Sequence, residues 1–286
     1  MVSRDMLDSV RGLCVVGCGT MGEAITRGLL DAGQIEAAQI CVTARHTKRL
    51  EALADNLGVR TQRDNLAAIR DADVVLLCVK PQHFAELLEP PEMAEATAGK
   101  LVISIAAGIE LERLAGWLPK AKLVRAMPNT SARIGRGMTV VTRAEGVTDE
   151  ELSIAESIFS AVGQVLELDN KHMNAVTSLN GSGPAFAYVM LEAMADGGVM
   201  MGLPRDAALK IAARVFSGAA AMVEETSLHP AALKDQVTTP AGCTIAGLLT
   251  MEDGRIRSVL ARTIQEATRV AAGLGDDSSG DEPPKR

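Results

Sequence analysis

The feature that most constrains this chain is a glycine-rich turn that joins a short apolar run to a helical stretch near the N-terminus. Leu13–Val16 leads directly into Gly17-Cys18-Gly19-Thr20-Met21-Gly22, and a helical pattern begins at Glu23. We expect Gly17 to permit the tight turn, Gly19 to let the backbone approach a pyrophosphate, and Gly22 to let the helix pack on the strand. The helix start offers phosphates free N–H groups and a partial positive charge. The turn therefore predicts a dinucleotide site, in preference to a bland tight turn, formed by Gly17, Cys18, Gly19, Thr20, Met21 and Gly22.

Around this turn, short β-rich runs alternate with amphipathic helical stretches such as Glu23–Asp31 and Lys48–Asn56. This alternation is typical of βαβ units in a doubly wound sheet. Residues 124–163 contain less helix, so the later strands can include antiparallel edge members. We expect strands at Leu13–Val16, Ile40–Thr43, Val74–Val79, Leu101–Ile105, Leu123–Ala126, Met138–Val141 and Val165–Leu168.

After about Asp169 the strand pattern gives way to long helical segments rich in Ala, Met and Gly. We expect Gly181–Pro184 to interrupt the first of them and Pro204 to lie in the first turn of a later one. Gly197, Gly198 and Gly218 within helical pattern indicate close helix crossings. The sequence thus predicts an α/β chain with an N-terminal dinucleotide-binding domain over residues 1–168, an all-helical domain over 169–275 and a disordered tail over 276–286. Such a helical domain is often intersubunit, although a monomeric bundle stays open.

Composition and charge disfavour several classes of protein. A net charge of −7 and an aromatic content of 2% argue against a nucleic-acid partner. No apolar run reaches the ~18 residues that span a bilayer, and residues 1–11, which lack the apolar core of a secretory signal, are expected to form a frayed extension. The five cysteines form no C-x-x-C pair, and four of them fall in or beside expected buried strands. We therefore expect small buried side chains that stay reduced, which fits a cytoplasmic location. The four histidines lie far apart, so no metal site is expected.

The end of the second expected strand bears on the choice of cofactor. NAD-binding chains usually place an Asp or Glu there to hold the ribose 2′-hydroxyl. Here Ile40–Thr43 is followed by Ala44-Arg45-His46-Thr47-Lys48-Arg49, with no acid before Glu51. Arg45 and its neighbours suit a 2′-phosphate, which a carboxylate would repel. We therefore predict NADPH in preference to NADH; a solvated basic helix start is the alternative reading.

Other strand ends should line the same crevice, because the carboxyl ends of parallel strands do so in this fold. Val79, Lys80 and Pro81 follow the third expected strand and should lie near the nicotinamide. Lys80 is a candidate catalytic acid, although a backbone contact with an outward-pointing side chain is equally compatible. Ala106 follows the fourth strand. Asn129 follows the fifth, where it contacts the ribose or the nicotinamide amide, or merely caps a turn.

The most distinctive segment of the helical part runs from Lys234 to Gly247. Its Thr239-Pro240-Ala241-Gly242-Cys243-Thr244 places hydroxyls directly before an apolar helix. Exposed N–H groups at a helix start, reinforced by threonine hydroxyls, are the chemistry of an anion pocket and would suit a carboxylate. A capped helix joint fits these residues equally well.

This segment is similar to the signature of the pyrroline-5-carboxylate reductase family. Further blocks of the same family follow in order and together cover nearly everything from residue 13 to about 270. They are Gly17–Gly22, Val79–Pro81, Ser104–Gly108, Arg125–Thr130, Gly181–Ala185, Ala195–Gly198, Gly202–Arg205 and His229-Pro230.

The resemblance implies a Rossmann domain followed by a helical dimerisation domain, a homodimer or larger dimer-based assembly, and an active site where the domains meet. The implied reaction is the NADPH-dependent reduction of 1-pyrroline-5-carboxylate to L-proline, the last step of proline biosynthesis. Thr239 and the backbone at Cys243 and Thr244 are implied to hold the substrate carboxylate, and Thr177 to lie close to the ring nitrogen.

Departures from the family pattern put single positions in doubt: Ser131, Phe186, Ser227, Ala241 and Cys243 replace more usual residues. The nearest alternative enzyme is a β-hydroxyacid dehydrogenase, which carries a catalytic lysine shortly after a glycine-rich helix start. Here no lysine follows Gly181–Gly183 until Lys210, which favours imine chemistry. A non-catalytic NADPH-binding protein is the alternative of another class.

Overall fold

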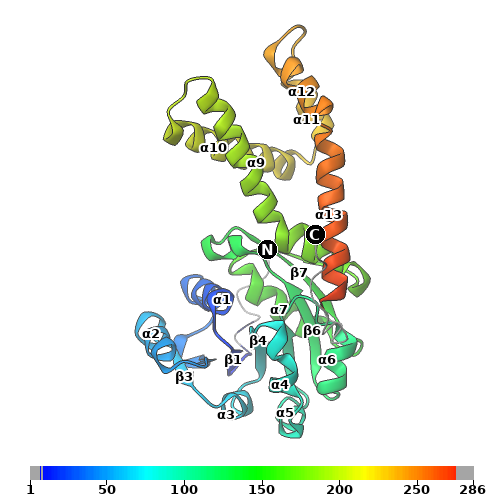
Figure 1. The fold of residues 1–286 in the computed structure, drawn as a ribbon. Helices are drawn as coiled ribbons and strands as arrows, with labels where there is room; N and C mark the ends of the chain where they lie inside the picture. The colour runs from blue at the N-terminus through cyan, green and yellow to red at the C-terminus, as the bar shows by residue number, and fades with distance from the viewer. Residues whose placement is uncertain (1–6, 8, 275–286) are drawn as a thin grey trace, which may run out of the picture. The chain divides into compact units, whose positions relative to one another are not determined.

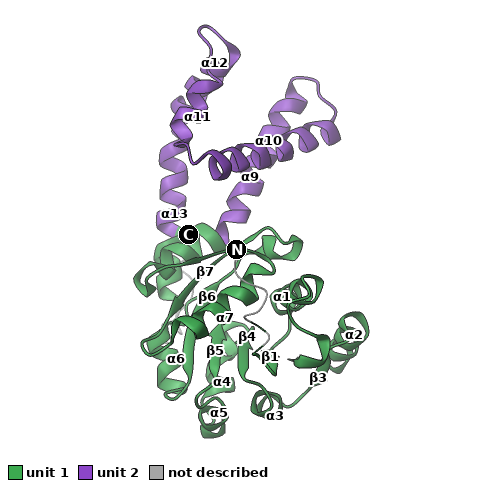
Figure 2. Cartoon of the chain, turned by 180° about the vertical axis from the view of Figure 1, so that it is seen from behind, with its two compact units in different colours: residues 1–181, 267–286 green, residues 182–266 purple. Residues whose placement is uncertain are grey.

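The computed structural model describes residue 7 and residues 9–274. The chain forms two compact units, coloured separately in Figure 2: one comprises the residues up to Gly181 together with those from Ala267 on, the other Ser182–Glu266. The first unit therefore extends beyond the domain boundary expected at residue 168. The expected tail over 276–286 lies outside the described residues.

One sheet organises the first unit (Figure 1). Its eight strands lie in the order β3-β2-β1-β4-β5-β6-β7-β8, and neighbouring strands are parallel except for β6 and β7. The order reverses direction between β1 and β4, which is where such sheets hold their ligands. The strands are β1 (Leu13–Val16), β2 (Ile40–Thr43), β3 (Arg60–Gln62), β4 (Val74–Leu77), β5 (Leu101–Ser104), β6 (Lys122–Met127), β7 (Gly137–Arg143) and β8 (Gly163–Glu167).

Helices cover both faces of this sheet, so β1, β2, β4 and β5 are buried along their whole length. Ile25, Leu53 and Ile158 from α1, α2 and α7 belong to one core; Ile69, Phe84 and Leu114 from α3, α4 and α6 belong to the other. The helical segments are α1 (Thr20–Asp31), η2 (Ala37–Gln39), α2 (Thr47–Leu57), α3 (Asn65–Arg70), η3 (Pro81–His83), α4 (Phe84–Leu88), α5 (Pro91–Ala96), α6 (Leu111–Trp117), η4 (Thr130–Ile134), α7 (Asp149–Ser160), η5 (Asn170–His172), α8 (Met173–Val176) and η6 (Thr177–Ser182).

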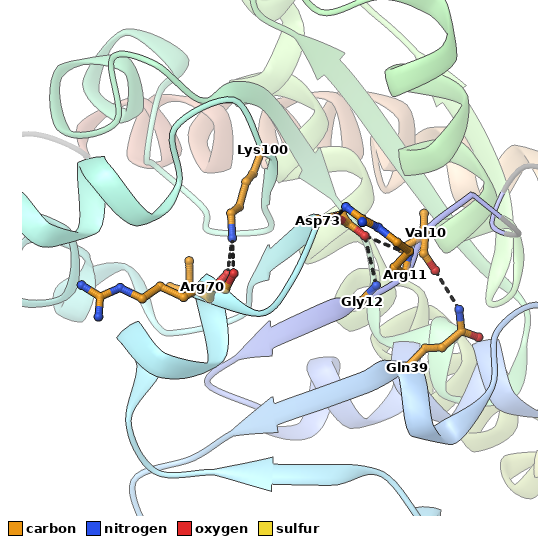
Figure 3. A network of polar contacts seen from close by, with 8 residues as sticks. Val10, Arg11, Gly12, Gln39, Arg70, Asp73 and Lys100 are labelled. Carbon is orange, nitrogen blue, oxygen red and sulfur yellow. Dashed lines mark hydrogen bonds and ion pairs between the residues drawn. The ribbon is translucent and has the colours of Figure 1, made fainter.

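The N-terminal segment corrects one expectation. Residues 7 and 9–11 are not a frayed extension, because Leu7 and Val10 are buried in the core. Figure 3 shows how polar contacts fix the segment that follows: the Asp73 carboxylate accepts from the Arg11 backbone N–H at 2.8 Å and from its side chain at 2.9 Å. Gln39 Nε2 donates to the Val10 carbonyl oxygen at 2.8 Å (Figure 3). An apolar pair and a paired charge therefore tie this segment to the sheet.

The helical part also corrects two expectations. The segment at Gly181–Pro184 does not interrupt the helix: η6 is a π-helical segment that leads into α9 (Gly183–Met200), and Pro184 is the second residue of α9. Pro204 is not in a first turn but is the N-cap of α10 (Arg205–Thr226). The remaining helices are α11 (Pro230–Gln236), α12 (Cys243–Asp253) and α13 (Ile256–Gly273).

The glycines of this part pack closely at one position. A Cβ at Gly198 would lie 3.2 Å from Leu203 Cδ1 and 3.3 Å from Ala208 Cβ, so Gly198 allows α9 to approach the start of α10. A Cβ at Gly197 or Gly218 would meet nothing within 4 Å in this chain. The expected close crossing is thus confirmed at Gly198 only.

Candidate functional site

The three glycines of the turn after β1 differ in what surrounds them. Gly17 has φ +75°, and a Cβ there would lie 2.3 Å from Val79 Cγ1. At Gly22 a Cβ would lie 3.2 Å from Val15 Cγ1, so this glycine lets α1 pack on β1. At Gly19 the nearest heavy atom to such a Cβ is 3.9 Å away, so the backbone there faces free space. The roles expected for these glycines are all compatible with this geometry.

The turn is held by residues from the second βα unit. The Cys18 N–H donates to the Thr43 carbonyl oxygen at 2.7 Å, and Arg49 Nε donates to the Cys18 carbonyl oxygen at 3.2 Å. Arg49 Nη2 also lies 2.5 Å from Glu23, and this hydrogen bond holds the pKa of the Glu23 carboxyl below its usual value. No side chain caps the start of α1 at Gly19, so its first N–H groups are available to an anion.

A cleft of about 590 Å³ opens in front of this turn. It is lined by six of the predicted cofactor residues: Gly17, Cys18, Gly19, Arg45, Val79 and Lys80. Thr20 lines a neighbouring hollow with Gly19, Arg27, Arg49 and Arg133. Sequence reasoning missed Arg63, Asp64, His83 and Glu86 as lining residues.

The charge of the cleft suits a phosphorylated ligand. Arg45, Arg49, Arg63 and Lys80 contribute four cations to its lining, against the two carboxylates Asp64 and Glu86. With a backbone that faces free space at Gly19 and an uncapped helix start, the residues present fit a dinucleotide with an additional phosphate.

Two predicted residues at later strand ends do not line this cleft. Ala106 is buried, and its N–H donates to Ser104 Oγ at 3.3 Å. Asn129 follows β6 and caps η4 by accepting from the Ser131 N–H at 3.2 Å, while its Nδ2 donates to Asn180 Oδ1 at 2.8 Å. The capping role of Asn129 is therefore confirmed, and its contact with cofactor stays a prediction.

Thr177, the predicted catalytic residue of the helical part, begins the π-helical segment η6. Its side chain is buried, and its hydroxyl donates to the Met173 carbonyl oxygen at 2.8 Å. Because the hydroxyl proton is held in this bond, the oxygen of Thr177 is better placed to accept a hydrogen bond than to donate one.

The predicted carboxylate-binding segment lies in the second unit. Thr239 folds over the start of α12: its carbonyl oxygen accepts from the Gly242 N–H at 3.1 Å, and a Cβ at Gly242 would lie 2.4 Å from its Oγ1. Gly242 is the N-cap of α12 and supplies no side-chain cap for the backbone N–H groups that follow, from Cys243 and Thr244 on. Ala241 adopts φ +58°, a left-handed conformation that favours glycine. This arrangement presents hydroxyl and N–H groups together, as an anion pocket requires.

The structure gives no reason for the departure at Ser227. Ser227 ends α10 as its C-cap with φ 53°.

In the part of the chain that the structure describes, no three His, Cys, Asp or Glu side chains gather in a way that could hold a metal ion. None of the described helices combines the length and apolar character needed to cross a membrane.

Two family models match parts of the chain. The model described as pyrroline-5-carboxylate reductase dimerisation matches residues 170–274. The model described as NADP oxidoreductase, coenzyme F420-dependent, matches residues 12–108.

Curated relatives and solved structures extend the match to nearly the whole chain. The pyrroline-5-carboxylate reductase of Schizosaccharomyces pombe is 40% identical over 280 residues, covering 92% of this chain and 99% of its own length. That of Synechocystis is 41% identical over 263 residues, covering 92% and 98%. The structure of a pyrroline-5-carboxylate reductase from Coxiella burnetii superimposes with a TM-score of 0.87 at 31% identity, covering 93% of this chain and 99% of that one. The Plasmodium falciparum pyrroline carboxylate reductase with NADP bound gives a TM-score of 0.83 at 25% identity, covering 93% and 98%.

Proposed function

The chain belongs to the pyrroline-5-carboxylate reductase family, and on this premise we propose how its residues carry the reaction. The reaction is the NADPH-dependent reduction of 1-pyrroline-5-carboxylate to L-proline, the last step of proline biosynthesis. One observation carries the assignment: a pyrroline-5-carboxylate reductase aligns with 92% of this chain and with 99% of its own length. The cationic cleft in front of the glycine turn supports the cofactor part of this assignment, a phosphorylated dinucleotide, independently of that alignment.

The cofactor, when bound, supplies the hydride that reduces the C=N carbon. The chain's part is to hold and orient it. Gly19 lets the backbone approach the pyrophosphate, the first N–H groups of α1 donate to it, and Arg45 binds the 2′-phosphate. The other residues that we propose to contact the cofactor are Gly17, Cys18, Thr20, Met21, Gly22, Val79, Lys80, Pro81, Ala106 and Asn129.

The substrate side needs no strong acid, because a protonated cyclic imine is already an electrophile. We propose that Thr177 retains the nitrogen proton: its oxygen accepts the N–H of the iminium while its own proton stays with Met173. Lys80, exposed on the lining of the cleft, is the second candidate for handling this proton. The orientation of donor and acceptor carbons then does most of the catalysis.

The substrate carboxylate is proposed to bind the start of α12. Thr239 offers a hydroxyl there, and the backbone at Cys243 and Thr244 offers N–H groups with no competing cap. A carboxylate is stabilised at a helix start both by these donors and by the helix dipole.

We propose that the chain self-associates as a homodimer or a larger dimer-based assembly. The match to a dimerisation model over residues 170–274 supports self-association. The helices of the second unit bury little within this chain, since the cluster between α9 and α10 consists of Ala195, Ala208 and Ala212. Large side chains there stay exposed, among them Tyr188 at 62% and Val189 at 65%, and apolar area of this kind is usually covered by another copy.

A cytoplasmic location is proposed from the free, largely buried cysteines.

The deciding experiment follows NADPH oxidation by the purified chain with 1-pyrroline-5-carboxylate, and in parallel NADP reduction with short 3-hydroxy acids. We expect turnover and formation of L-proline in the first reaction and none in the second. Turnover with a 3-hydroxy acid alone would assign the chain to the β-hydroxyacid dehydrogenases, and binding of NADPH without any turnover would make it a binding protein.

A further inference from the structure

His83 lies on the wall of the cofactor cleft, just after the chain leaves β4. It is the last residue of η3, its side chain is 31% exposed, and it lines the cleft together with Gly17, Gly19 and Arg45. The roles assigned above make no use of it.

The ring of His83 bridges two charged side chains. Its Nε2 lies 3.3 Å from Arg45 Nη1, and its Nδ1 lies 3.7 Å from Glu86 Oε2. A guanidinium has only donors, so Nε2 must accept the bond and carry no proton. In this arrangement His83 is neutral, with its proton on Nδ1 toward Glu86, and it holds the guanidinium of Arg45 at the cleft.

The charged and titratable groups that line the cleft with His83 come from four segments. Arg45 and His46 follow β2, Arg63 and Asp64 follow β3, Lys80 follows β4, and Glu86 lies in α4. Among the described residues, no carboxylate forms an ion pair with Arg45, so its other N–H groups are open to an anion.

A phosphate monoester would change the state of this pair. Near pH 7 such a group is largely a dianion with three acceptor oxygens. A dianion bound by Arg45 comes within reach of the ring that Arg45 touches, and negative charge favours the protonated imidazole. A protonated ring no longer accepts from Arg45. Its Nε2–H is then free to donate to the phosphate, while Glu86 continues to face the Nδ1–H.

We propose that His83 is a specificity-determining residue for the 2′-phosphorylated nicotinamide dinucleotide, and that it takes up a proton from solvent as the phosphate binds. The inference rests on the proposed function in one respect, the binding of this cofactor in the cleft. An unphosphorylated ribose brings no charge to the pair, so NADH gains nothing from His83. Selection for NADPH is therefore shared between Arg45, which is always charged, and His83, which becomes charged on binding.

The test compares 2′,5′-ADP with 5′-AMP, which differ only in the 2′-phosphate, by titration calorimetry of the whole chain in two buffers of different ionisation enthalpy. We expect the wild type to bind 2′,5′-ADP at least about tenfold more tightly and with the larger proton uptake. His83→Gln should lose about tenfold in affinity for 2′,5′-ADP, keep its affinity for 5′-AMP, and take up fewer protons. Glutamine can still contact Arg45 but cannot titrate, so a merely structural role for the ring would leave proton uptake unchanged.

Two further variants sharpen the assignment. His46→Gln removes the other histidine of the cleft and should keep the proton uptake. His83→Arg carries a permanent charge, and should keep the preference for 2′,5′-ADP while losing the uptake. The proposal is overturned if His83→Gln matches the wild type in affinity and uptake, or if the uptake disappears in His46→Gln instead.

The proposed function can fail separately. If the chain binds 2′,5′-ADP with proton uptake but does not reduce pyrroline-5-carboxylate, the inference on His83 stands and the proposed reaction is wrong. A chain that binds neither nucleotide overturns both.

Discussion

The side-chain nitrogen of Asn129 donates to the side-chain oxygen of Asn180 across 2.8 Å, and backbone groups fix the direction of this bond. Asn180 Nδ2 donates to the carbonyl oxygens of Met127 at 2.7 Å and Met138 at 3.0 Å. Carbonyls only accept, so the nitrogen of Asn180 must face them and its oxygen must face Asn129. One amide thus ties the adjacent ends of β6 and β7 to η6, and orients a residue proposed to contact the cofactor.

Asn180→Asp should therefore affect both stability and cofactor binding. The substitution keeps the shape but turns a carboxylate toward two carbonyl oxygens and leaves them without a donor. We expect the free energy of unfolding in urea to fall by about 2–3 kcal/mol and the Kd for NADPH to rise, as measured by fluorescence titration. Asn180→Ser keeps one donor, so its free energy of unfolding and its Kd for NADPH should lie between those of the wild type and those of Asn180→Asp. Wild-type stability in Asn180→Asp would show that these bonds contribute nothing.

Alanine at two glycines of the turn should separate folding from binding. Gly17→Ala introduces a Cβ that would lie 2.3 Å from Val79 Cγ1 at φ +75°, so both thermal stability and NADPH affinity should fall. Gly19→Ala meets nothing closer than 3.9 Å and should fold with the wild-type Tm, yet bind NADPH at least about tenfold more weakly, because the methyl group occupies the approach to the pyrophosphate. Wild-type affinity in Gly19→Ala would remove the pyrophosphate from this turn.

Ala241→Gly should stabilise the chain. Ala241 holds φ +58°, which costs a residue with a Cβ about 1 kcal/mol, whereas glycine adopts it freely. We expect the free energy of unfolding in urea to rise by somewhat less than this, since glycine also loosens the unfolded chain. Ala232→Gly in the exposed helix α11 is the matched control and should destabilise by up to about 1 kcal/mol. Equal effects at the two positions would mean that the conformation at Ala241 carries no strain.

Thr177→Val tests the proposed acceptor for the iminium N–H. Valine keeps the volume and removes the oxygen, so kcat should fall about 10- to 100-fold with little change in the KM for NADPH. Thr177→Ser, which retains the hydroxyl, should restore most of the rate. Full kcat in Thr177→Val across the pH range would dismiss Thr177, and a comparable loss in Lys80→Met would point to Lys80 instead.

The pairing of Asp73 predicts a stability that depends on pH. Partial burial alone would raise the pKa of this carboxyl, but hydrogen bonds from Arg11 and Gly12 outweigh it and lower the pKa below its usual range. A lowered folded-state pKa gives stability that is present above the unfolded value and lost as pH falls through the folded value. Asp73→Asn should therefore cost about 1 kcal/mol at pH 7 in urea unfolding and almost nothing near pH 2. A difference between wild type and Asp73→Asn that stays constant with pH would contradict the prediction.

The strands could be predicted where both faces are buried. β1 and β2 begin and end at the expected residues, because continuous apolar runs mark strands covered on both sides. β3 was missed because Arg60, Thr61 and Gln62 are exposed and polar. It exists through main-chain pairing with β2, which leaves no hydrophobic pattern in the sequence. The antiparallel members expected among the later strands are confirmed: β7 pairs antiparallel with β6, and the edge strand β8 runs parallel to β7.

Some residues of the site could likewise be predicted from the sequence and others could not. The glycine turn and Arg45 could be predicted because their chemistry is local to one βα unit. Asn180 could not, since its partners Met127 and Met138 lie 53 and 42 residues away and offer only carbonyl oxygens, which every residue has. His83 likewise meets Arg45 only after β2 and β4 come to lie on either side of β1.

Only one of the five cysteines is exposed, which should make its thiol selectively reactive. Burial raises the pKa of Cys14 to about 12 and that of Cys18 to about 11, and raises those of Cys41 and Cys78 as well. Cys243 is exposed and is the first residue of α12. A maleimide dye should thus attach at one of five cysteines, with nothing engineered. It would report from the helix start at which we propose the substrate carboxylate binds.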